Sequence, residues 1–451
     1  MSLRRWIITA VALLLLGTGL WWWLAPTTFV TGVIAASATE AVVLSRQNTD
    51  RSTSFWVSLQ TTDGPAWVHR AVDADDVSAE SLTTSDARVT YLMLQEQQLV
   101  VVGLDRQTGA VAWETLLGEI EDHYLTTWLY AISRVEGDML LVPHYAGEGM
   151  LAALALSDGT LRWRQPLPET SELPTGLWLQ HGDTHHFETI DPSDGTRTVR
   201  GDAAFNQCLL EDMIYTVRED ALVRVFPADD AAPISLPVEG GRLKACGRQG
   251  EAMILTLTVG DKTVLARVDE GEITGILSLD WPHATGGPSC RIARFSQASH
   301  ALKAELPRFL PLMFSAMDPD IDTLRFIVVD LADLTIAAEA TPSREYLYFE
   351  QLRAGDTHYF WYHGGLTIAV DGATGSLTGT SRGGRSLDGR SIVDGVVWMG
   401  GEGVEGWQPP RRPAAAWLDG RTLEALGTVG KTSAFQPADD AIMELTGWTI
   451  P

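Results

Sequence analysis

The chain has 451 residues, of which 45% are hydrophobic and 20% charged, and its formal net charge is −25. This composition is that of a globular protein long enough to bury a substantial core. The charge argues against nucleic acid as a partner, because phosphate binding needs clustered lysine and arginine. The acidic residues are scattered along the chain, which indicates a solvated surface.

The first predicted element is a membrane helix over residues 6–24, an uncharged and almost wholly apolar stretch that follows Arg4 and Arg5. As a helix it would be about 28 Å long, close to the thickness of a bilayer core. Trp21, Trp22 and Trp23 stand at its far end, where indoles favour the headgroup region. The arginines predict that residues 1–5 are cytoplasmic and that everything after the helix is exported.

A cleaved signal peptide is the alternative to this signal anchor. Residues 36–38 (Ala-Ser-Ala) fit the small-x-small rule for cleavage, but they lie well beyond the apolar run, in a predicted linker over residues 25–38. No cysteine stands near the segment, so it does not predict a lipoprotein anchor. Both alternatives place the remaining chain outside the cytoplasm. We expect a single-pass protein of the bacterial inner membrane with a periplasmic domain.

From residue 39 onward the sequence predicts short strands separated by turns that contain Asp and Gly. Residues 299–317 are the exception. They predict a short helix or an irregular insertion, interrupted by Pro307 and Pro311.

One unit recurs: an apolar strand, a turn with Asp and Gly, and a second strand that often carries Trp. The clearest copy spans residues 99–117. The carboxylate of Asp105 can accept hydrogen bonds from amides two residues on, and Gly109 can take the positive φ of a short turn. Trp113 offers a large apolar face to the neighbouring repeat. The repeat residues are Asp63, Gly64, Trp67, Asp105, Thr108, Gly109, Trp113, Asp158, Gly159, Trp163, Asp371, Thr374 and Gly375.

The spacing of these turns predicts the fold. They fall near residues 64, 109, 159, 271, 333, 375 and 421, with weaker copies near 195 and 230. An average of about 45 residues fits the four-stranded blades of a β-propeller. We therefore expect an all-β propeller over residues 39–451, with seven or eight blades and eight favoured. Residues 433–436 and 441–448 are expected to complete an N-terminal blade that lacks a strand, which removes exposed edges.

The segment from Asp105 to Gly109, followed by Trp113, resembles the signature of PQQ-like propeller repeats. These repeats define the superfamily of quinoprotein alcohol dehydrogenases. The superfamily also includes non-enzymatic scaffolds, such as the lipoprotein subunit of the outer-membrane barrel-assembly machinery. The resemblance implies a propeller of the same general architecture as WD40 and YVTN repeats. It implies an enzyme much less strongly.

Three cysteines, Cys208, Cys246 and Cys290, each stand near the start of a predicted first strand. First strands line the central channel of a propeller, so the three side chains could lie close together. Three interpretations remain open: small buried thiols (the default), one disulfide between neighbouring blades, or a thiolate metal site. The odd number leaves at least one cysteine unpaired within the chain.

Other polar and aromatic clusters are interpreted as solvated or structural. They are the histidines at 181, 185 and 186, the acidic residues at 318, 320 and 322, and the tryptophans at 398, 407 and 417. Catalytic, cofactor-binding and metal-binding residues are not assigned, and no cofactor is expected. The sequence favours a non-catalytic binding or assembly scaffold for an envelope protein or polysaccharide. The alternative is a propeller enzyme, either a PQQ-type oxidoreductase or a hydrolase or lyase. The family resemblance would then imply a pair of adjacent cysteines, which the chain does not contain.

Overall fold

The structure is a computed structural model that describes residues 27–48, 52–78, 81–119, 133–146, 148–167, 171–175, 178–181, 187–200, 207–210, 213–226, 233–236, 238–260, 262–280, 306–315, 324–340, 349–362, 366–382, 390–393, 396–401, 414–423, 425–429 and 436–437. Every element in these ranges is a β-strand. Within them, no helix is long and apolar enough to cross a membrane. The predicted anchor at residues 6–24, with Trp21, Trp22 and Trp23, lies outside the described residues.

The described strands form nine antiparallel sheets, which we number in chain order. Sheet 1 contains β1 (Thr27–Ser37), β2 (Glu40–Asn48), β3 (Thr53–Thr61) and β4 (Gly64–Ala71). Sheet 2 contains β5 (Asp76–Val77), β6 (Thr83–Thr84), β7 (Arg88–Gln95), β8 (Gln98–Asp105) and β9 (Val111–Glu119). Sheet 3 contains β10 (Arg134–Glu136), β11 (Met139–Ala146), β12 (Glu148–Ala155) and β13 (Leu161–Pro166).

The next three sheets continue the series. Sheet 4 contains β14 (Ser171–Thr175), β15 (Trp178–His181), β16 (Phe187–Ile190) and β17 (Arg197–Val199). Sheet 5 contains β18 (Gln207–Leu210), β19 (Met213–Arg218), β20 (Ala221–Phe226) and β21 (Ile234–Ser235). Sheet 6 contains β22 (Arg242–Gln249), β23 (Ala252–Val259), β24 (Lys262–Asp269) and β25 (Glu272–Asp280).

The last three sheets end the series. Sheet 7 contains β26 (Phe309–Ser315), β27 (Leu324–Asp330) and β28 (Thr335–Ala340). Sheet 8 contains β29 (Phe349–Ala354), β30 (Thr357–Tyr362), β31 (Leu366–Asp371), β32 (Leu377–Arg382) and β37 (Gln436–Pro437). Sheet 9 contains β33 (Arg390–Val393), β34 (Val396–Gly401), β35 (Ala414–Asp419) and β36 (Ala425–Val429).

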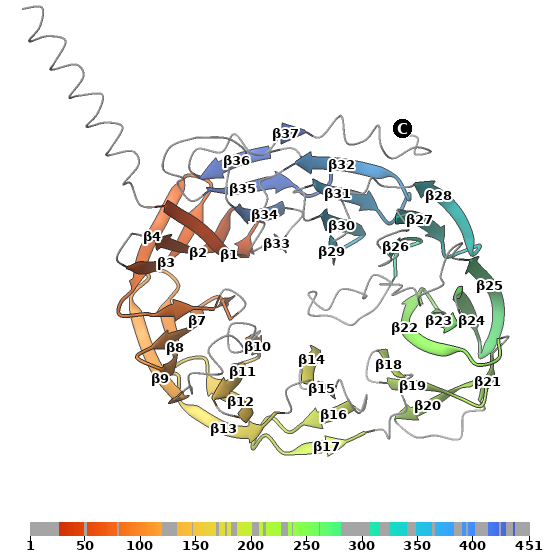
Figure 1. Cartoon of the computed structure of the whole chain (residues 1–451), viewed down its shortest axis with the longest axis horizontal. Helices are drawn as coiled ribbons and strands as arrows, with labels where there is room; N and C mark the ends of the chain where they lie inside the picture. Colours follow the sequence, from red (N-terminus) through yellow and green to blue (C-terminus); the bar gives the residue numbers. More distant parts are fainter. Residues whose placement is uncertain are drawn as a thin grey trace, which may run out of the picture.

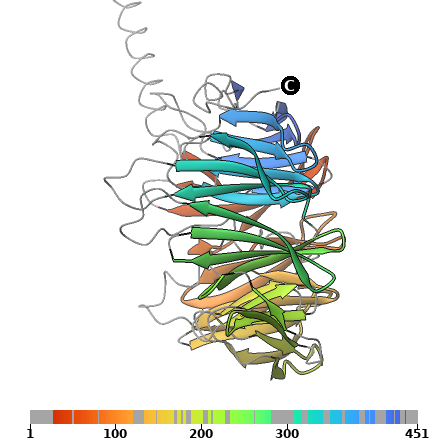
Figure 2. The same cartoon turned by 90° about the vertical axis from the view of Figure 1, so that its right-hand side faces the viewer.

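These sheets follow one another round a ring in the order of the sequence (Figure 1). In the side view, the strands run across the thickness of the ring (Figure 2). The ring closes where β1 lies against β33 and β34. Antiparallel sheets that stand radially about an axis define a β-propeller, which confirms the predicted fold class.

The burial of each strand follows from its place in its sheet. A middle strand such as β8 is covered on both faces, so it is a continuous apolar run with six consecutive buried residues. The outer strand β9 alternates, with Trp113 and Leu117 buried and Leu116 exposed. A large apolar cluster between sheets 1 and 2 includes Phe55 and Tyr91. We call the contact between two consecutive sheets a seam.

Three expectations about the ends and the insertion are corrected. Residues 27–37, placed in the linker, form β1 and pair along their length with β2, so the first sheet is complete without C-terminal strands. Of the C-terminal residues expected to complete sheet 1, only Gln436 is described, and it pairs with β32 of sheet 8. Residues 433–435 and 441–448 lie outside the described residues. Residues 309–315, expected to be helical or irregular, form β26, whose Pro311 is tolerated because β26 is an edge strand of the described sheet.

The predicted count of eight blades is not confirmed, since the described residues form nine sheets. The eight-blade prediction treated the first and last strands as one shared blade. The pairing of β1 with β2 removes the reason for that assumption.

Candidate functional site

Six turns, which lead into β9, β13, β17, β28, β32 and β36, share a five-residue form that begins at residues 105, 155, 191, 330, 371 and 419. In five of them the amide of the fifth residue donates to the carbonyl of the first, as Gly109 does to Asp105 at 2.8 Å. The fifth residue has a positive φ in every copy: Gly at 109, 159, 195 and 375, and Leu at 334 and 423. This conformation is easy for Gly and rare for Leu.

Aspartate at the first position stabilises the turn. The Asp105 carboxylate accepts hydrogen bonds from the Gln107 amide, the Thr108 amide and the Thr108 hydroxyl, at 2.9 to 3.1 Å. Asp419 is held in the same way by the amide and hydroxyl of Thr422. The hydrogen bonds from Thr108 lower the pKa of Asp105, because they favour the charged carboxylate.

The predicted repeat residues do not all occupy equivalent places. Asp158 is the fourth residue of its turn, whose first residue is Ala155, and it accepts from the Thr160 amide at 2.9 Å. Asp63 lies in a hairpin loop of two residues, Thr62 and Asp63, because Thr61 pairs directly with Gly64, the first residue of β4. Asp371 does match Asp105, since its carboxylate accepts from the amides of the two residues that precede Gly375.

The tryptophan of one sheet packs into the turn of the next sheet at three seams. Trp67, Trp113 and Trp163 are each at most 8% exposed. Each indole N–H donates to the carbonyl of the second residue of the turn. Trp67 donates to Arg106 at 2.7 Å, Trp113 to Leu156 at 3.2 Å, and Trp163 to Pro192 at 3.1 Å. A Cβ atom on the fifth residue, Gly109, Gly159 or Gly195, would lie 2.5 to 2.6 Å from the indole ring. Glycine is therefore required by the ring as well as by the backbone.

Other donors satisfy the same carbonyl at the later seams. Arg267 of sheet 6 donates to Leu331 of sheet 7 at 3.1 Å. The Phe309 amide of sheet 7 donates to Gly372 of sheet 8 at 2.7 Å. The Tyr359 hydroxyl of sheet 8 donates to Gly420 of sheet 9. At all six seams with this turn, a group from the preceding sheet thus occupies the second turn carbonyl.

At two of these seams, the tryptophan position is occupied by glycine and the fifth turn residue is leucine. Gly275 and Gly379 occupy the register position that Trp113 holds in sheet 2. In each strand this residue directly follows the unpaired residue of a β-bulge. The turns that face them end in Leu334 and Leu423 instead of Gly. A Cβ atom on Gly275 would lie 3.0 Å from Leu334, so the leucine fills the space of the missing indole. The sequence-based interpretation missed these pairs because it searched for Trp and Gly alone.

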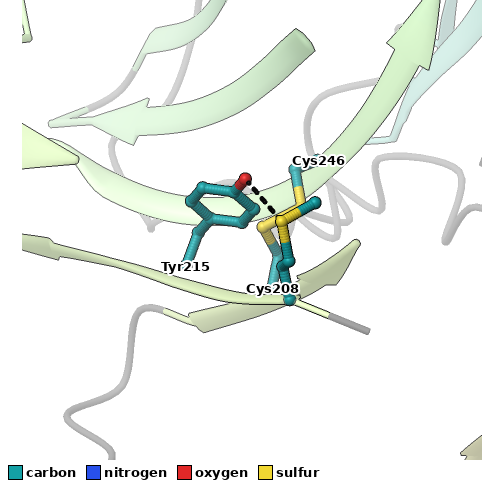
Figure 3. The surroundings of a disulfide bond; sticks show 4 residues. Cys208, Tyr215 and Cys246 are labelled. Atoms are coloured by element: carbon teal, nitrogen blue, oxygen red, sulfur yellow. Dashed lines mark hydrogen bonds between the residues drawn. A yellow bond between two sulfur atoms is a disulfide. The ribbon is translucent and has the colours of Figure 1, made fainter. Parts of the chain in front are cut away.

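The seam between sheets 5 and 6 has a covalent link. Cys208 on β18 and Cys246 on β22 form a disulfide with a Cα–Cα distance of 5.9 Å. Tyr215 lies directly across the ladder from Cys208, and its ring stands beside the disulfide (Figure 3). Its hydroxyl donates to the Met213 sulfur at 3.4 Å. Both cysteines are at most 7% exposed.

Of the three interpretations of the cysteines, the structure therefore has the disulfide for Cys208 and Cys246. Neither of these two is a thiol or a thiolate ligand. Cys290 lies outside the described residues, as do His185, His186 and residues 316–323. The described residues contain no group of three or more His, Cys, Asp and Glu side chains that could hold a metal ion.

One buried titratable group stands on the face of sheet 3 that packs against sheet 2. His144 is fully buried, and its Nδ1 lies 3.2 Å from the carbonyl of Val142. Its Nε2 has no hydrogen-bond partner among the described residues. Burial, with a smaller contribution from Arg164, lowers the pKa of His144 to about 4. The imidazole is therefore neutral at pH 7.

Taken together, the described polar side chains hold neighbouring sheets in fixed positions. The turn carboxylates cap backbone amides, the aromatic and arginine donors occupy turn carbonyls, and the cysteines are oxidised. This arrangement supports a rigid ring that presents loops at both ends of its strands.

No protein-family model matches the chain, and no curated protein matches it. Among solved structures, the chain is similar to BamB from Moraxella catarrhalis, with 11% identity, coverage of 81% of this chain and 92% of that chain, and a TM-score of 0.43. It is similar to the C-terminal WD40 domain of Sif2 (9% identity, 83% and 94% coverage, TM-score 0.41). It is also similar to a quinohemoprotein alcohol dehydrogenase from Comamonas testosteroni, with 12% identity, coverage of 87% of this chain and 76% of that chain, and a TM-score of 0.38. The propeller assignment rests on the sheets of this chain and not on these likenesses.

Proposed function

We propose that the chain is a non-catalytic binding or assembly scaffold, anchored in the bacterial inner membrane by residues 6–24, with its propeller in the periplasm. The observation that carries the proposal is the disulfide between Cys208 and Cys246. Disulfides persist in oxidising compartments and are rare in the cytosol. A propeller with a disulfide between two of its sheets therefore fits a place outside the cytoplasm, which the arginines before the apolar segment also favour.

The scaffold role is supported by how the repeat uses its polar groups. The turn carboxylates and the donors at the seams act on the propeller itself, so they give rigidity. A rigid ring suits binding, because a partner then loses little free energy in ordering the surface that it contacts. We propose that the loops at one end of the strands contact an envelope protein or polysaccharide, within the scaffold branch of the PQQ-like repeats.

The location can be tested with the full chain in a Gram-negative host. We expect the protein in the inner-membrane fraction, with the propeller sensitive to protease once the outer membrane is permeabilised. Replacing Leu14 and Leu15 by Arg should abolish insertion, because charge at the centre of a helix opposes it. The matched control replaces the same two residues by Val.

Counting the free thiols of the protein tests the proposed location independently. Protein denatured without reductant should expose one thiol, since two of the three cysteines are paired. Three thiols in freshly isolated protein, or a protease-resistant propeller in intact spheroplasts, would contradict the proposed location.

The partner can be sought from both ends of one sheet. The Glu96–Gln97 turn and the turn at residues 105–109 stand at opposite ends of β8, and both Glu96 and Gln107 are exposed. A photo-crosslinking amino acid at each position, in the anchored full chain, should trap one envelope component from one end and not from the other. No adduct at either end, together with substrate turnover when PQQ and calcium are added, would favour an enzyme and contradict the scaffold.

A further inference from the structure

The first strand determines how close the propeller lies to the proposed anchor. The anchor ends at Leu24 and β1 begins at Thr27, so only Ala25 and Pro26 stand between them. The three residue steps from Leu24 to Thr27 span at most about 11 Å at full extension. The headgroup layer on one side of a bilayer is about 5 to 7 Å thick. With the anchor in the bilayer, the start of β1 therefore lies in the headgroup layer or directly above it.

The direction of β1 decides which end of the propeller lies next to the bilayer. Thr27 pairs with Asn48 at one end of sheet 1, and Ser37 pairs with Glu40 at the other end. The Glu40 carboxylate accepts a hydrogen bond at 2.9 Å from Arg106, the second residue of the five-residue turn of sheet 2. That turn therefore lies at the end where β1 finishes. The end where β1 begins, which we call the anchor end, is the opposite one.

An exposed patch of mixed chemistry lies on the half of sheet 1 nearer the anchor end. Val68 on β4 and Val72, which follows β4 directly, are 56% and 61% exposed. Arg70 stands between them, is exposed, and lies with its guanidinium carbon 5.6 Å from the centre of the Trp56 ring. Trp56 is half-buried and pairs with Arg70 across the ladder. We call Trp56, Val68, Arg70 and Val72 the sheet 1 patch.

Each kind of side chain in the sheet 1 patch suits the surface of a bilayer. Indoles favour the headgroup region, guanidinium groups bind phosphates, and aliphatic side chains favour the boundary with the acyl chains. Asp73 and Asp75 follow the patch in the chain and are exposed, so charge alone does not attract it to anionic lipids. The short connection to the anchor compensates, because it keeps the patch at a high effective concentration near the bilayer.

We propose that the sheet 1 patch contacts the bilayer surface and that the anchor end of the propeller faces the membrane. The opposite end, with the five-residue turn of sheet 2, then faces the periplasm, where a partner can reach it. This inference rests on the anchor of the proposed function and adds to it the orientation of the propeller.

Probes at the two ends of β4 test the orientation. Val72→Cys and Asp63→Cys each place a thiol at an exposed position, one after β4 and one before it, about 30 Å apart along the strand. The full chain also carries Cys290→Ser, so that the probe is the single unpaired thiol. Each thiol is labelled with a fluorophore. The chain is then reconstituted into vesicles of phosphatidylethanolamine and phosphatidylglycerol in which some headgroups carry a nitroxide quencher.

We expect the nitroxide headgroups to quench the Val72→Cys probe at least about threefold more strongly than the Asp63→Cys probe, because only the first lies near the headgroup layer. Equal quenching, or stronger quenching at Asp63→Cys, in a chain that floats with the vesicles would overturn the orientation and leave the anchor intact. A chain that does not float with the vesicles would overturn the anchor, and with it both the proposed location and this inference.

A longer connection separates the contact of the patch from the effect of the tether. Inserting about twelve Gly and Ser residues after Pro26 allows a separation of about 20 Å, so the patch itself must then keep the propeller at the bilayer. In this background we expect Val68→Glu to lower the quenching of the Val72→Cys probe about threefold, because a carboxylate opposes contact with the bilayer.

Ile276→Glu is the matched control for Val68→Glu. Ile276 is 47% exposed on β25, an outer strand of sheet 6, which lies across the ring from sheet 1 (Figure 1). This substitution should leave the quenching unchanged. Equal effects of the two substitutions would overturn the contact of the patch. Complete loss of quenching on lengthening the connection alone would overturn it as well, because the tether would then be the whole cause.

Discussion

Consecutive sheets are held together by tryptophan contacts in sheets 1 to 4 and by a disulfide between sheets 5 and 6. In the first region, three tryptophans fit onto turn glycines of the following sheet and donate to a turn carbonyl. In the second region, the disulfide between Cys208 and Cys246 links the two innermost strands. The residue of sheet 4 that aligns with Trp113, Val199, is 53% exposed and makes no such contact. The disulfide thus appears where the tryptophan series has ended.

The difference shows which part of the repeat is essential. The hydrogen bond to the second turn carbonyl is present at all six seams with a five-residue turn, although its donor changes from Trp to Arg267, to a backbone amide and to Tyr359. The side chain that fills the space also changes. A buried carbonyl must be satisfied, whereas an apolar volume can be filled from either partner.

The largest effect is expected at a tryptophan seam. Trp113→Ala removes a side chain that is 8% exposed and faces Gly159, and it leaves the Leu156 carbonyl without its donor. We expect a loss of about 4 kcal/mol in the free energy of unfolding, as for other buried aromatic truncations. Urea denaturation followed by circular dichroism measures it.

Trp113→Phe separates the contribution of ring packing from that of the hydrogen bond to Leu156. It keeps an aromatic ring over Gly159 and removes the indole donor, so we expect roughly half the loss. A loss below about 1 kcal/mol for Trp113→Ala would mean that the tryptophans do not hold the seams together.

Removing the disulfide is expected to have the next largest effect. Cys208→Ala with Cys246→Ala opens a link between residues separated by 38 positions. We expect a loss of about 3 kcal/mol, mainly through greater freedom of the unfolded chain. Reductant should reproduce the loss in the parent and have no effect on the double variant. If reductant leaves the parent unchanged, the large apolar cluster shared by sheets 5 and 6 holds this seam without help.

The sequence located the turns better than it counted the blades. Eight of its nine turn positions, including the weak one near 195, fall in or beside a turn between two paired strands of a described sheet, and the ninth, near 230, lies outside the described residues. Turn chemistry is local, so Asp and Gly reveal it at short range. The count depended on how the ends meet, which is a long-range property. The strand β1 was missed because residues 27–37 follow directly on the apolar segment.

The seam chemistry was predictable only where the repeat is strong. Trp113 and Trp163 each stand four residues after the glycine of their turn, and Trp67 stands three residues after Gly64, so packing onto a neighbouring sheet followed from the pattern. Arg267 and Tyr359 come from other strands, and no spacing connects them to the turns they contact. The pairing of Cys208 with Cys246 needed the spatial distance between β18 and β22. A search for Gly at the tryptophan position and Leu at the fifth turn residue would have found two more seams.

Acid should weaken the tryptophan region more than the disulfide region. The unfolded state takes up a proton at His144 as the pH falls through 6.5, but the folded state, whose His144 pKa is about 4, does not. The contribution of His144 to stability is therefore complete above pH 6.5 and decreases as the pH falls toward 4. Between pH 8 and pH 5 we expect it to decrease by about 2 kcal/mol.

The measurement compares urea denaturation of the parent and of His144→Met over that range. The variant should lose less stability on acidification, since it has no imidazole to protonate at this position. A parallel pH dependence for the two proteins would show that His144 is not the group responsible. The turn carboxylates contribute little over this range, because aspartate in an unfolded chain titrates at about pH 4 and hydrogen bonds lower the pKa of Asp105 and Asp419 further in the folded state.

The smallest loss of stability is expected from removing one hydrogen-bond donor, the hydroxyl of Tyr359. Tyr359 is 2% exposed, and burial raises its pKa to about 12, so its hydroxyl stays protonated and donates to the Gly420 carbonyl. Tyr359→Phe keeps the ring and removes this one hydrogen bond. We expect a loss of about 1 kcal/mol in the free energy of unfolding. The Phe substitution at Trp113, which also removes one donor, should cost more, because it reduces the packed ring as well. If Tyr359→Phe leaves the free energy of unfolding unchanged, the hydrogen bond to the second turn carbonyl does not stabilise the six seams. Packing of the side chain that fills the space would then be their shared source of stability.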